Sequence, residues 1–209
     1  MKLARKQRIN EIYEMARDYF TLEGVVKRST HRYRSGREAP WYVDFDNIAN
    51  DPVRCRVTTQ LYADRIEEIT KQRNIDFLGF IDKSEGGTVG TIRLAGAISI
   101  LTDTPNVAIR PGKDISHERL KIPLQKGRIG ENRACQATCI ILTDHCTTGS
   151  EVLEAVRAAE SNGVKVTDII AYTRSSEFDS QEFTQKGIKF HWFYETPRDL
   201  EKVGIDELE

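Results

Sequence analysis

The sequence predicts an α/β fold with a central, mostly parallel sheet flanked by helices. From residue 75 onward, short apolar runs alternate with segments of helical periodicity, as in parallel strands joined by right-handed crossovers. Two of these runs are followed by turns rich in glycine or hydroxyl groups, at the strand ends where open α/β sheets bind ligands. A chain of 209 residues can bury a sizeable core, so we expect one structural domain overall.

Residues 1–74 are expected to form an N-terminal part with two helices around a short strand-rich section. Apolar residues recur at intervals of three and four over residues 4–20, which predicts an amphipathic helix. Asp51 and Pro52 fit the N-cap and first turn of a second helix, which should end near Asn74.

Residues 75–209 are expected to form the α/β core. The expected strands are 76–81, 106–110, 137–143, 165–173 and 187–194, and the expected helices are 87–101, 150–161 and a short one at the C-terminus. Residues 111–134 are too long and too charged for an ordinary connection, and a mobile lid, a disordered segment and a β-hairpin are the alternatives.

Charge and hydropathy exclude some partners. The 31 basic and 32 acidic side chains nearly cancel, so no global field attracts nucleic acid, and we do not expect it as a partner. The first thirty residues do not resemble a signal peptide, and no apolar stretch has the length of a membrane span, so we expect no membrane partner.

The cysteines are Cys55, Cys135, Cys139 and Cys146. Their spacing fits no metal-binding pattern, which indicates free thiols and a reducing cytoplasm. A zinc site that combines two of them with His117 and His145 also has unusual spacing and is disfavoured. A helix N-terminus after Cys146 could lower the pKa of its thiol, although no neighbouring base suggests a nucleophile.

An apolar run, a carboxylate and a turn of small hydroxylated residues follow one another between Cys139 and Glu151. The run predicts a strand and the residues after the turn predict a helix. Backbone N–H groups and the dipole at the helix N-terminus favour a phosphate monoester. The groups expected to hold it are Thr147, Thr148, Gly149 and Ser150, while Asp144 can face a sugar hydroxyl. A strand, turn and helix without a ligand is the alternative.

The segment Leu142-Thr-Asp-His-Cys-Thr-Thr-Gly-Ser150 resembles the phosphoribosyl pyrophosphate (PRPP) motif of type I phosphoribosyltransferases. That motif has an apolar strand, two acidic residues, two variable residues and Thr-Thr-Gly. Asp144 matches the second acid, whereas Thr143 replaces the first with a hydroxyl that can bond a ribose oxygen but carries no charge. The resemblance implies that both residues and the turn after them bind PRPP.

The first core strand leads into Gly79-Phe-Ile-Asp-Lys-Ser-Glu-Gly-Gly-Thr88, which resembles the pyrophosphate loop of the same family. The resemblance implies that Lys83 pairs with the pyrophosphate of PRPP. A tight turn at Gly86-Gly87 without a ligand is the alternative.

The start of the long loop, Ile109-Arg-Pro-Gly-Lys-Asp114, resembles the segment that opens the mobile catalytic loop of orotate phosphoribosyltransferases. The resemblance implies that Arg110 binds PRPP and that Lys113, with His117 as a looser match, acts in catalysis. A solvated loop with incidental charge is the alternative.

Two segments resemble base-binding parts of orotate phosphoribosyltransferases. Tyr33-Arg-Ser-Gly-Arg-Glu-Ala-Pro-Trp-Tyr-Val-Asp44 is similar to their hood, and Tyr172-Thr-Arg-Ser-Ser-Glu177 to a strand end whose arginine contacts the orotate carboxylate. The implied base-binding residues are Arg34, Trp41, Tyr42 and Arg174. A surface hairpin and an incidental surface arginine are the alternatives.

Together, these segments imply the type I phosphoribosyltransferase fold with a small N-terminal hood over the base site. The implied reaction moves the phosphoribosyl group of PRPP to a nucleobase, most closely orotate, with Mg2+ held mainly by the substrate, in a homodimer whose lid reaches the partner's site. Two alternatives are a transferase for another base and a protein of this fold that senses PRPP or a nucleotide without turnover.

Overall fold

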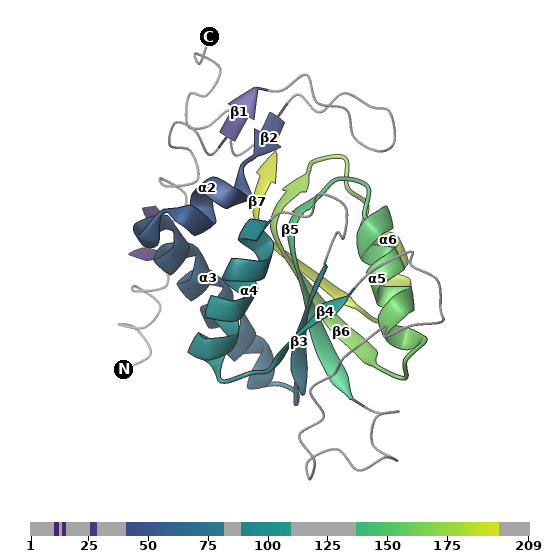
Figure 1. The fold of residues 1–209 in the computed structure, drawn as a ribbon. Coiled ribbons are helices and arrows are strands. Elements are labelled where there is room, and N and C mark those ends of the chain that lie inside the picture. Colours follow the sequence, from purple (N-terminus) through teal and green to yellow (C-terminus); the bar gives the residue numbers. More distant parts are fainter. Residues whose placement is uncertain are drawn as a thin grey trace.

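The computed structural model describes residues 11–12, 14–15, 26–28, 41–81, 89–109 and 137–196. Within these ranges a central sheet has the strand order β4-β3-β5-β6-β7 (Figure 1). Its strands are β3 (Phe77–Ile81), β4 (Asn106–Ile109), β5 (Thr138–Cys146), β6 (Lys165–Ser175) and β7 (Lys189–Thr196). Every neighbouring pair is parallel, which confirms the predicted α/β class.

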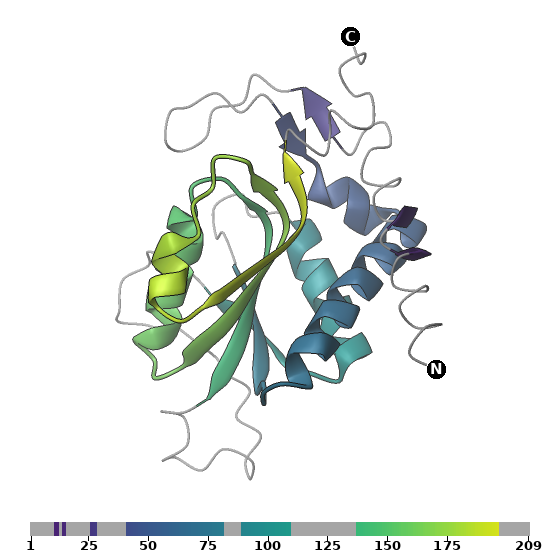
Figure 2. The same cartoon turned by 180° about the vertical axis from the view of Figure 1, so that it is seen from behind.

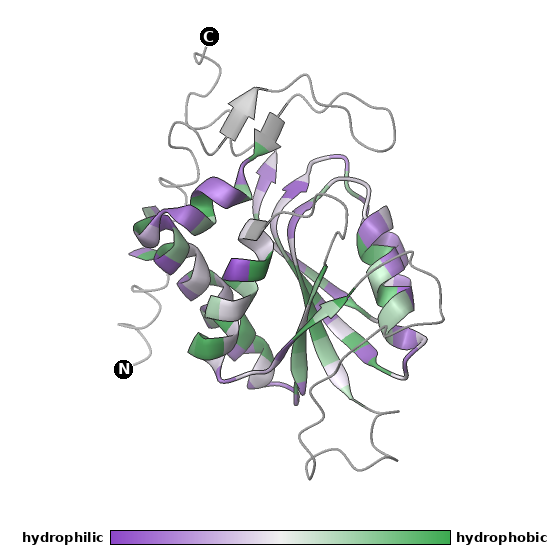
Figure 3. Cartoon of the chain, viewed as in Figure 1, coloured by the Kyte–Doolittle hydropathy of each residue, from purple (hydrophilic) through white to green (hydrophobic). Residues whose placement is uncertain are grey.

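Helices cover both faces of this sheet (Figures 1 and 2). One face carries α2 (Phe45–Asn50), α3 (Pro52–Thr70) and α4 (Val89–Thr102), and the other carries α5 (Ser150–Glu160) and α6 (Gln181–Gln185). Figure 3 shows hydrophobic residues concentrated on the central strands, whereas the helices carry both hydrophobic and hydrophilic residues. Two apolar clusters result, one on each face, and the first joins α2 and α3 to the sheet in one continuous core.

The start of α3 follows the sequence prediction. The Asp51 carboxylate accepts hydrogen bonds from the amides of Val53 at 2.8 Å and Arg54 at 2.9 Å, and Pro52 occupies the first turn. Such a cap satisfies amides that have no partner within the helix.

A small antiparallel sheet lies at the carboxyl end of the central strands in both views (Figures 1 and 2). It consists of β1 (Val26–Arg28) and β2 (Trp41–Val43), with Tyr42 opposite Lys27. This is the place expected for a hood above the ligand-binding edge. The proposed division between residues 1–74 and 75–209 stays a prediction.

Several boundaries differ from the sequence prediction: α3 ends at Thr70 rather than near Asn74, and β7 covers Lys189–Thr196 rather than 187–194. β5 continues to Cys146 because its last residues still pair with β6, and β6 continues to Ser175 because it pairs with β7. The helices α2 and α6 were not predicted, since both are too short to show a periodic apolar pattern. The helix over 4–20, the C-terminal helix and the loop over 111–134 lie wholly or mostly outside the described residues, although residues 11, 12, 14 and 15 are helical.

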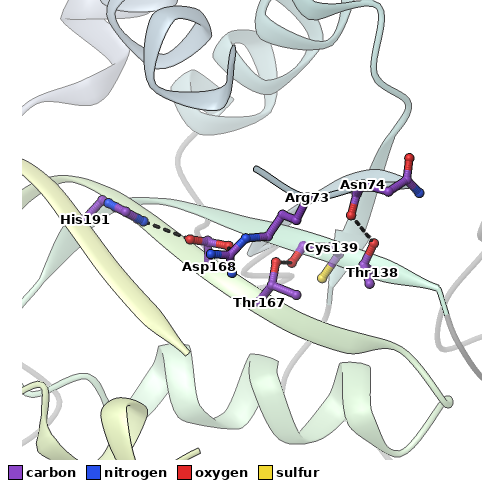
Figure 4. Close-up of polar contacts among 7 residues, drawn as sticks. All are labelled: Arg73, Asn74, Thr138, Cys139, Thr167, Asp168 and His191. Atoms are coloured by element: carbon purple, nitrogen blue, oxygen red, sulfur yellow. Dashed lines mark hydrogen bonds and ion pairs between the residues drawn. The ribbon is translucent and has the colours of Figure 1, made fainter. Parts of the chain in front are cut away.

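A buried carboxylate of β6 joins β7 to the segment that follows α3 (Figure 4). Asp168 is 0% exposed, and its oxygens contact Arg73 Nη1 at 3.2 Å and His191 Nε2 at 2.9 Å. Burial alone would raise the pKa of Asp168, but hydrogen bonds from His191 and Thr167 and the charge of Arg73 outweigh it, so the pKa is lowered. His191 therefore has a structural role, because it ties β7 to the buried carboxylate of β6. None of the described helices has the length and apolarity needed to cross a membrane.

Candidate functional site

Most of the described candidate residues lie at the carboxyl edge of the central sheet. Thr143 and Asp144 are near the end of β5, Arg174 is near the end of β6, and the turn from Thr147 to Gly149 connects β5 with α5. Cys146 is opposite Arg174 in the parallel register, which brings the β5 and β6 ends together. Ligands of open α/β sheets bind at this edge.

Gly149 gives the turn before α5 its shape. Its φ of +79° lies in the left-handed region, and it is the N-cap of the helix. A Cβ at this position would come within 2.8 Å of Phe178 Cε2 and 3.1 Å of Phe183 Cε2. Both the backbone angle and the aromatic side chains beneath the turn therefore require glycine.

The N-terminus of α5 presents hydroxyl groups and backbone amides. Its N-cap, Gly149, has no side chain, and the amide of Ser150 donates a long, 3.5 Å hydrogen bond to the Thr148 hydroxyl. Thr148 and Ser150 are exposed, and their hydroxyl oxygens lie 3.0 Å apart. A pair of hydroxyls beside the positive end of an eleven-residue helix is suited to an anion with several oxygens.

Asp144 is a half-buried carboxylate at the end of β5. Its Oδ1 accepts a hydrogen bond from the amide of His145 at 2.7 Å and lies 3.5 Å from the Thr143 hydroxyl. Its Oδ2 lies 3.5 Å from the hydroxyl of Thr91, in the first turn of α4. The carboxylate thus lies beside the start of α4, and its oxygens can accept further hydrogen bonds from a polyhydroxylated ligand.

Thr143 is 5% exposed, and its backbone is fixed by α3. The hydroxyl of Tyr62 donates a 2.9 Å hydrogen bond to the Thr143 carbonyl oxygen. Burial, with a smaller contribution from Asp144, raises the pKa of Tyr62 well above its ordinary value, so the phenol stays protonated and acts as a donor.

The expectation that the helix N-terminus lowers the pKa of Cys146 is wrong. The thiol is 2% exposed, and burial, assisted by the charge of Asp144, raises its pKa to about 12. The apolar surroundings outweigh the hydrogen bond from the Gly149 amide and the charge of Arg174. Cys146 is a core residue under the turn.

Arg174 is held by two residues of β7. Its Nε and Nη2 donate to Glu195 Oε2 at 3.0 and 2.5 Å, and its guanidinium carbon lies 3.6 Å from the ring centroid of Trp192. The Arg174 side chain is 19% exposed and that of Glu195 is 10% exposed. The arginine is therefore a partly exposed, oriented group rather than a mobile surface charge.

Several expected site residues cannot be placed. Lys83, Arg110, Lys113, His117 and Arg34 lie outside the described residues. Trp41 and Tyr42 are in β2, and the structure describes only the backbone of these two residues. Their roles stay predictions.

The structure adds residues that the sequence prediction missed. Thr91 and Tyr62 contact the Asp144 and Thr143 region, and Glu195 and Trp192 hold Arg174. Asp46 of α2 accepts a 2.6 Å hydrogen bond from the Gly90 amide at the start of α4. Thr91 could have been predicted as a site residue from its position just after a glycine-rich loop. The other four residues could not, because their contacts depend on how elements distant in sequence pack together.

Comparisons with known proteins agree with this geometry. No protein-family model matches the chain. An orotate phosphoribosyltransferase of Methanothermobacter thermautotrophicus is 29% identical over 166 residues, which cover 78% of this chain and 81% of that protein. An orotate phosphoribosyltransferase of Pyrococcus horikoshii is 25% identical over 170 residues, which cover 81% and 83% of the two chains.

Solved structures show the same fold. The orotate phosphoribosyltransferase of Aeropyrum pernix superposes with a TM-score of 0.66 at 17% identity, over 90% of this chain and 98% of that one. The Mycobacterium tuberculosis orotate phosphoribosyltransferase in complex with PRPP gives a TM-score of 0.57 at 19% identity, over 92% and 98% of the two chains. The resemblance indicated by the sequence motifs and the type I phosphoribosyltransferase fold are thereby confirmed.

Proposed function

We propose that this chain is an enzyme that transfers the phosphoribosyl group of PRPP to orotate, giving orotidine 5'-monophosphate and pyrophosphate. The observation that carries the proposal is a carboxylate, Asp144, near the end of β5, followed in sequence by the hydroxyl-bearing N-terminus of α5 at the carboxyl edge of the sheet. One group suits sugar hydroxyls and the other suits a phosphate. The curated relatives with the name orotate phosphoribosyltransferase support orotate as the base.

In this proposal, the turn from Thr147 to Ser150 holds the 5'-phosphate of PRPP. The backbone amides and the hydroxyls of Thr148 and Ser150 supply hydrogen-bond donors, and the helix dipole favours the negative charge. Gly149 lets the turn adopt its left-handed backbone angle directly above Phe178 and Phe183, where a side chain would clash.

Asp144 would accept hydrogen bonds from the ribose hydroxyls. During the reaction, the bond between the anomeric carbon and pyrophosphate breaks and a bond to a ring nitrogen of the base forms. Positive charge develops on the ribose as the bond breaks, and a fixed carboxylate nearby stabilises it. Thr143 would contribute its hydroxyl to the same sugar.

Pyrophosphate departure needs positive charge. We assign this role to Lys83, Arg110 and Lys113, with His117 beside them, as the family resemblance implies. Closure of the loop over 111–134 would exclude water, which otherwise hydrolyses PRPP. When bound, Mg2+ would neutralise pyrophosphate oxygens, and one protein carboxylate such as Asp144 beside substrate oxygens is a donor set that this ion accepts.

The base would lie between the hood and the ends of β6 and β7. Arg34, Trp41 and Tyr42 would approach it from the hood, and Arg174 would meet its carboxylate. The place of the small β1–β2 sheet at the carboxyl edge supports this arrangement (Figure 1).

One observation favours a second candidate, a protein that binds PRPP without turning it over or that uses another base. Thr143 supplies no charge where the motif has an acid. Product assays with PRPP, Mg2+ and orotate, uracil, hypoxanthine or adenine distinguish these cases. Orotidine 5'-monophosphate alone supports the proposal, another nucleotide identifies another base, and PRPP binding without product identifies a sensor.

We also propose a homodimer in a reducing cytoplasm. Three apolar side chains of α4 are exposed: Ile92 at 44%, Ile100 at 85% and Leu101 at 51%. Exposed aliphatic residues on one helix are typical of a contact surface. Cys55, Cys139 and Cys146 are free thiols, as in reducing compartments.

A further inference from the structure

Arg174 is fixed in plane and direction by β7. Glu195 Oε2 accepts from its Nε and Nη2, and the Trp192 ring lies under the guanidinium. The two contacts restrict different motions of the guanidinium. Stacking on the aromatic ring fixes the plane of the guanidinium, and the hydrogen bonds to the carboxylate fix its rotation within that plane.

One edge of this guanidinium is left over. Of the groups that the structure describes, none accepts a hydrogen bond from Arg174 Nη1. A guanidinium has five N–H donors in a planar fork, so the edge formed by Nη1 and Nη2 can still serve a planar carboxylate. The Arg174 side chain is 19% exposed, so a ligand can reach part of it.

The charge of Arg174 is already balanced by Glu195. A ligand at the remaining edge is therefore recognised by directional hydrogen bonds more than by net attraction. Directional recognition depends on how well the donor is held, because an ordered guanidinium loses less freedom when the ligand binds.

We infer that Glu195 and Trp192 are positioning residues of the acceptor-base site, which orient Arg174 toward a carboxylate in the plane of the base. The inference rests on the proposed function and adds to it the two β7 side chains on which selectivity for an anionic base depends. Neither side chain needs to touch the substrate.

The test is steady-state kinetics of wild type, Glu195→Gln and Trp192→Leu with orotate and PRPP varied separately. Losing the orienting acid or ring should raise the KM for orotate about tenfold for Glu195→Gln and about fivefold for Trp192→Leu. The KM for PRPP and kcat should change less than about twofold, because the PRPP groups lie on β5 and α5. Trp192→Phe, which keeps an aromatic face, should restore most of the orotate affinity.

Glu182→Gln is the matched control, since Glu182 pairs with Arg157 at 3.6 Å on the exposed surface between α5 and α6. It should leave both KM values unchanged. If Glu195→Gln does not fold, Glu195→Asp replaces it, because a shorter acid draws the guanidinium away from its position and should give the same rise.

Two failures can be told apart. Wild-type protein that makes no orotidine 5'-monophosphate overturns the proposed function and, with it, this inference. An active wild type together with an unchanged or lower KM for orotate in Glu195→Gln overturns the inference alone, as does an equal loss of PRPP and orotate affinity.

Discussion

The hydroxyl of Tyr62 donates a 2.9 Å hydrogen bond to the carbonyl oxygen of Thr143, across 81 positions of sequence. The bond ties the middle of α3 to the strand end that carries Asp144. It does so inside an aromatic cluster in which the Tyr62 ring packs edge-on against Phe193 and stacks on Tyr172. The position of the proposed ribose-binding carboxylate therefore depends on a residue that is itself buried.

Tyr62→Phe tests this dependence. The change keeps the ring and leaves the Thr143 carbonyl without its donor, so the free energy of unfolding should fall by about 1–2 kcal/mol. Asp144 would be less well held, and the KM for PRPP should rise a few-fold while that for orotate changes less. Chemical denaturation and kinetics measure the two effects, and unchanged stability would contradict this role of the hydroxyl.

Gly149→Ala should damage both fold and PRPP binding. Alanine at a φ of +79° is strained, and its Cβ would meet Phe178 at 2.8 Å, so we expect a loss of about 2 kcal/mol or more in unfolding free energy. PRPP affinity, measured by calorimetry, should fall at least tenfold because the turn must move.

Gly96→Ala is the matched control for Gly149→Ala. Gly96 lies within α4, where a Cβ would meet nothing within 4 Å, so alanine should stabilise by about 0.5–1 kcal/mol. Intact PRPP affinity in Gly149→Ala would show that the turn does not hold the phosphate.

The Asp168 cluster predicts a pH-dependent stability. The pKa of Asp168 is lowered in the folded protein relative to 3.8, so its ion pairs stabilise the fold above about that pH and are lost as the pH falls through the folded value. Asp168→Asn should cost about 3 kcal/mol at pH 7, because the amide carries no charge and keeps one acceptor oxygen where Arg73 and His191 use two.

The difference between wild type and Asp168→Asn should shrink as the pH falls below about 4, as followed by urea unfolding at several pH values. Glu154→Gln, on the exposed side of α5, serves as the control and should show no such trend. A difference that is independent of pH would show that Asp168 acts through packing alone.

Ile100→Lys tests the proposed homodimer. Ile100 is the most exposed large apolar side chain among the described residues, at 85%, and a charge there should dissociate a dimer formed through α4. Light scattering after gel filtration gives the mass. Val53→Lys, an exposed apolar position on α3, should leave the mass unchanged, and an Ile100→Lys protein that stays dimeric would place the contact elsewhere.

The alternation of apolar runs and helical patterns was enough to predict the central sheet, because buried parallel strands are nearly continuous apolar segments. It was not enough to place the end of β5, since Asp144 and His145 look like turn residues although the strand continues through them and His145 still pairs with Thr173 of β6. Backbone pairing between neighbouring strands outweighed the local preference of these polar residues.

The turn from Thr147 to Ser150 could be predicted because its chemistry is contiguous in sequence. The partners of Arg174 could not be predicted, since Glu195 and Trp192 belong to the next strand. They are brought next to Arg174 only by the register in which β6 and β7 pair. The pKa of Cys146 was predicted in the wrong direction for a similar reason. The helix that follows Cys146 can be predicted from the sequence, but the packing that buries the thiol and raises its pKa cannot.

The most direct test of the central claim is the formation of orotidine 5'-monophosphate from PRPP, orotate and Mg2+ by wild type and by Asp144→Asn. We expect product from wild type and a fall of about 10²-fold in kcat/KM for the variant, because the amide keeps the shape of Asp144 but not its charge. Thermal unfolding of both proteins controls for stability. No product from wild type, or equal rates for the two proteins, would contradict the account.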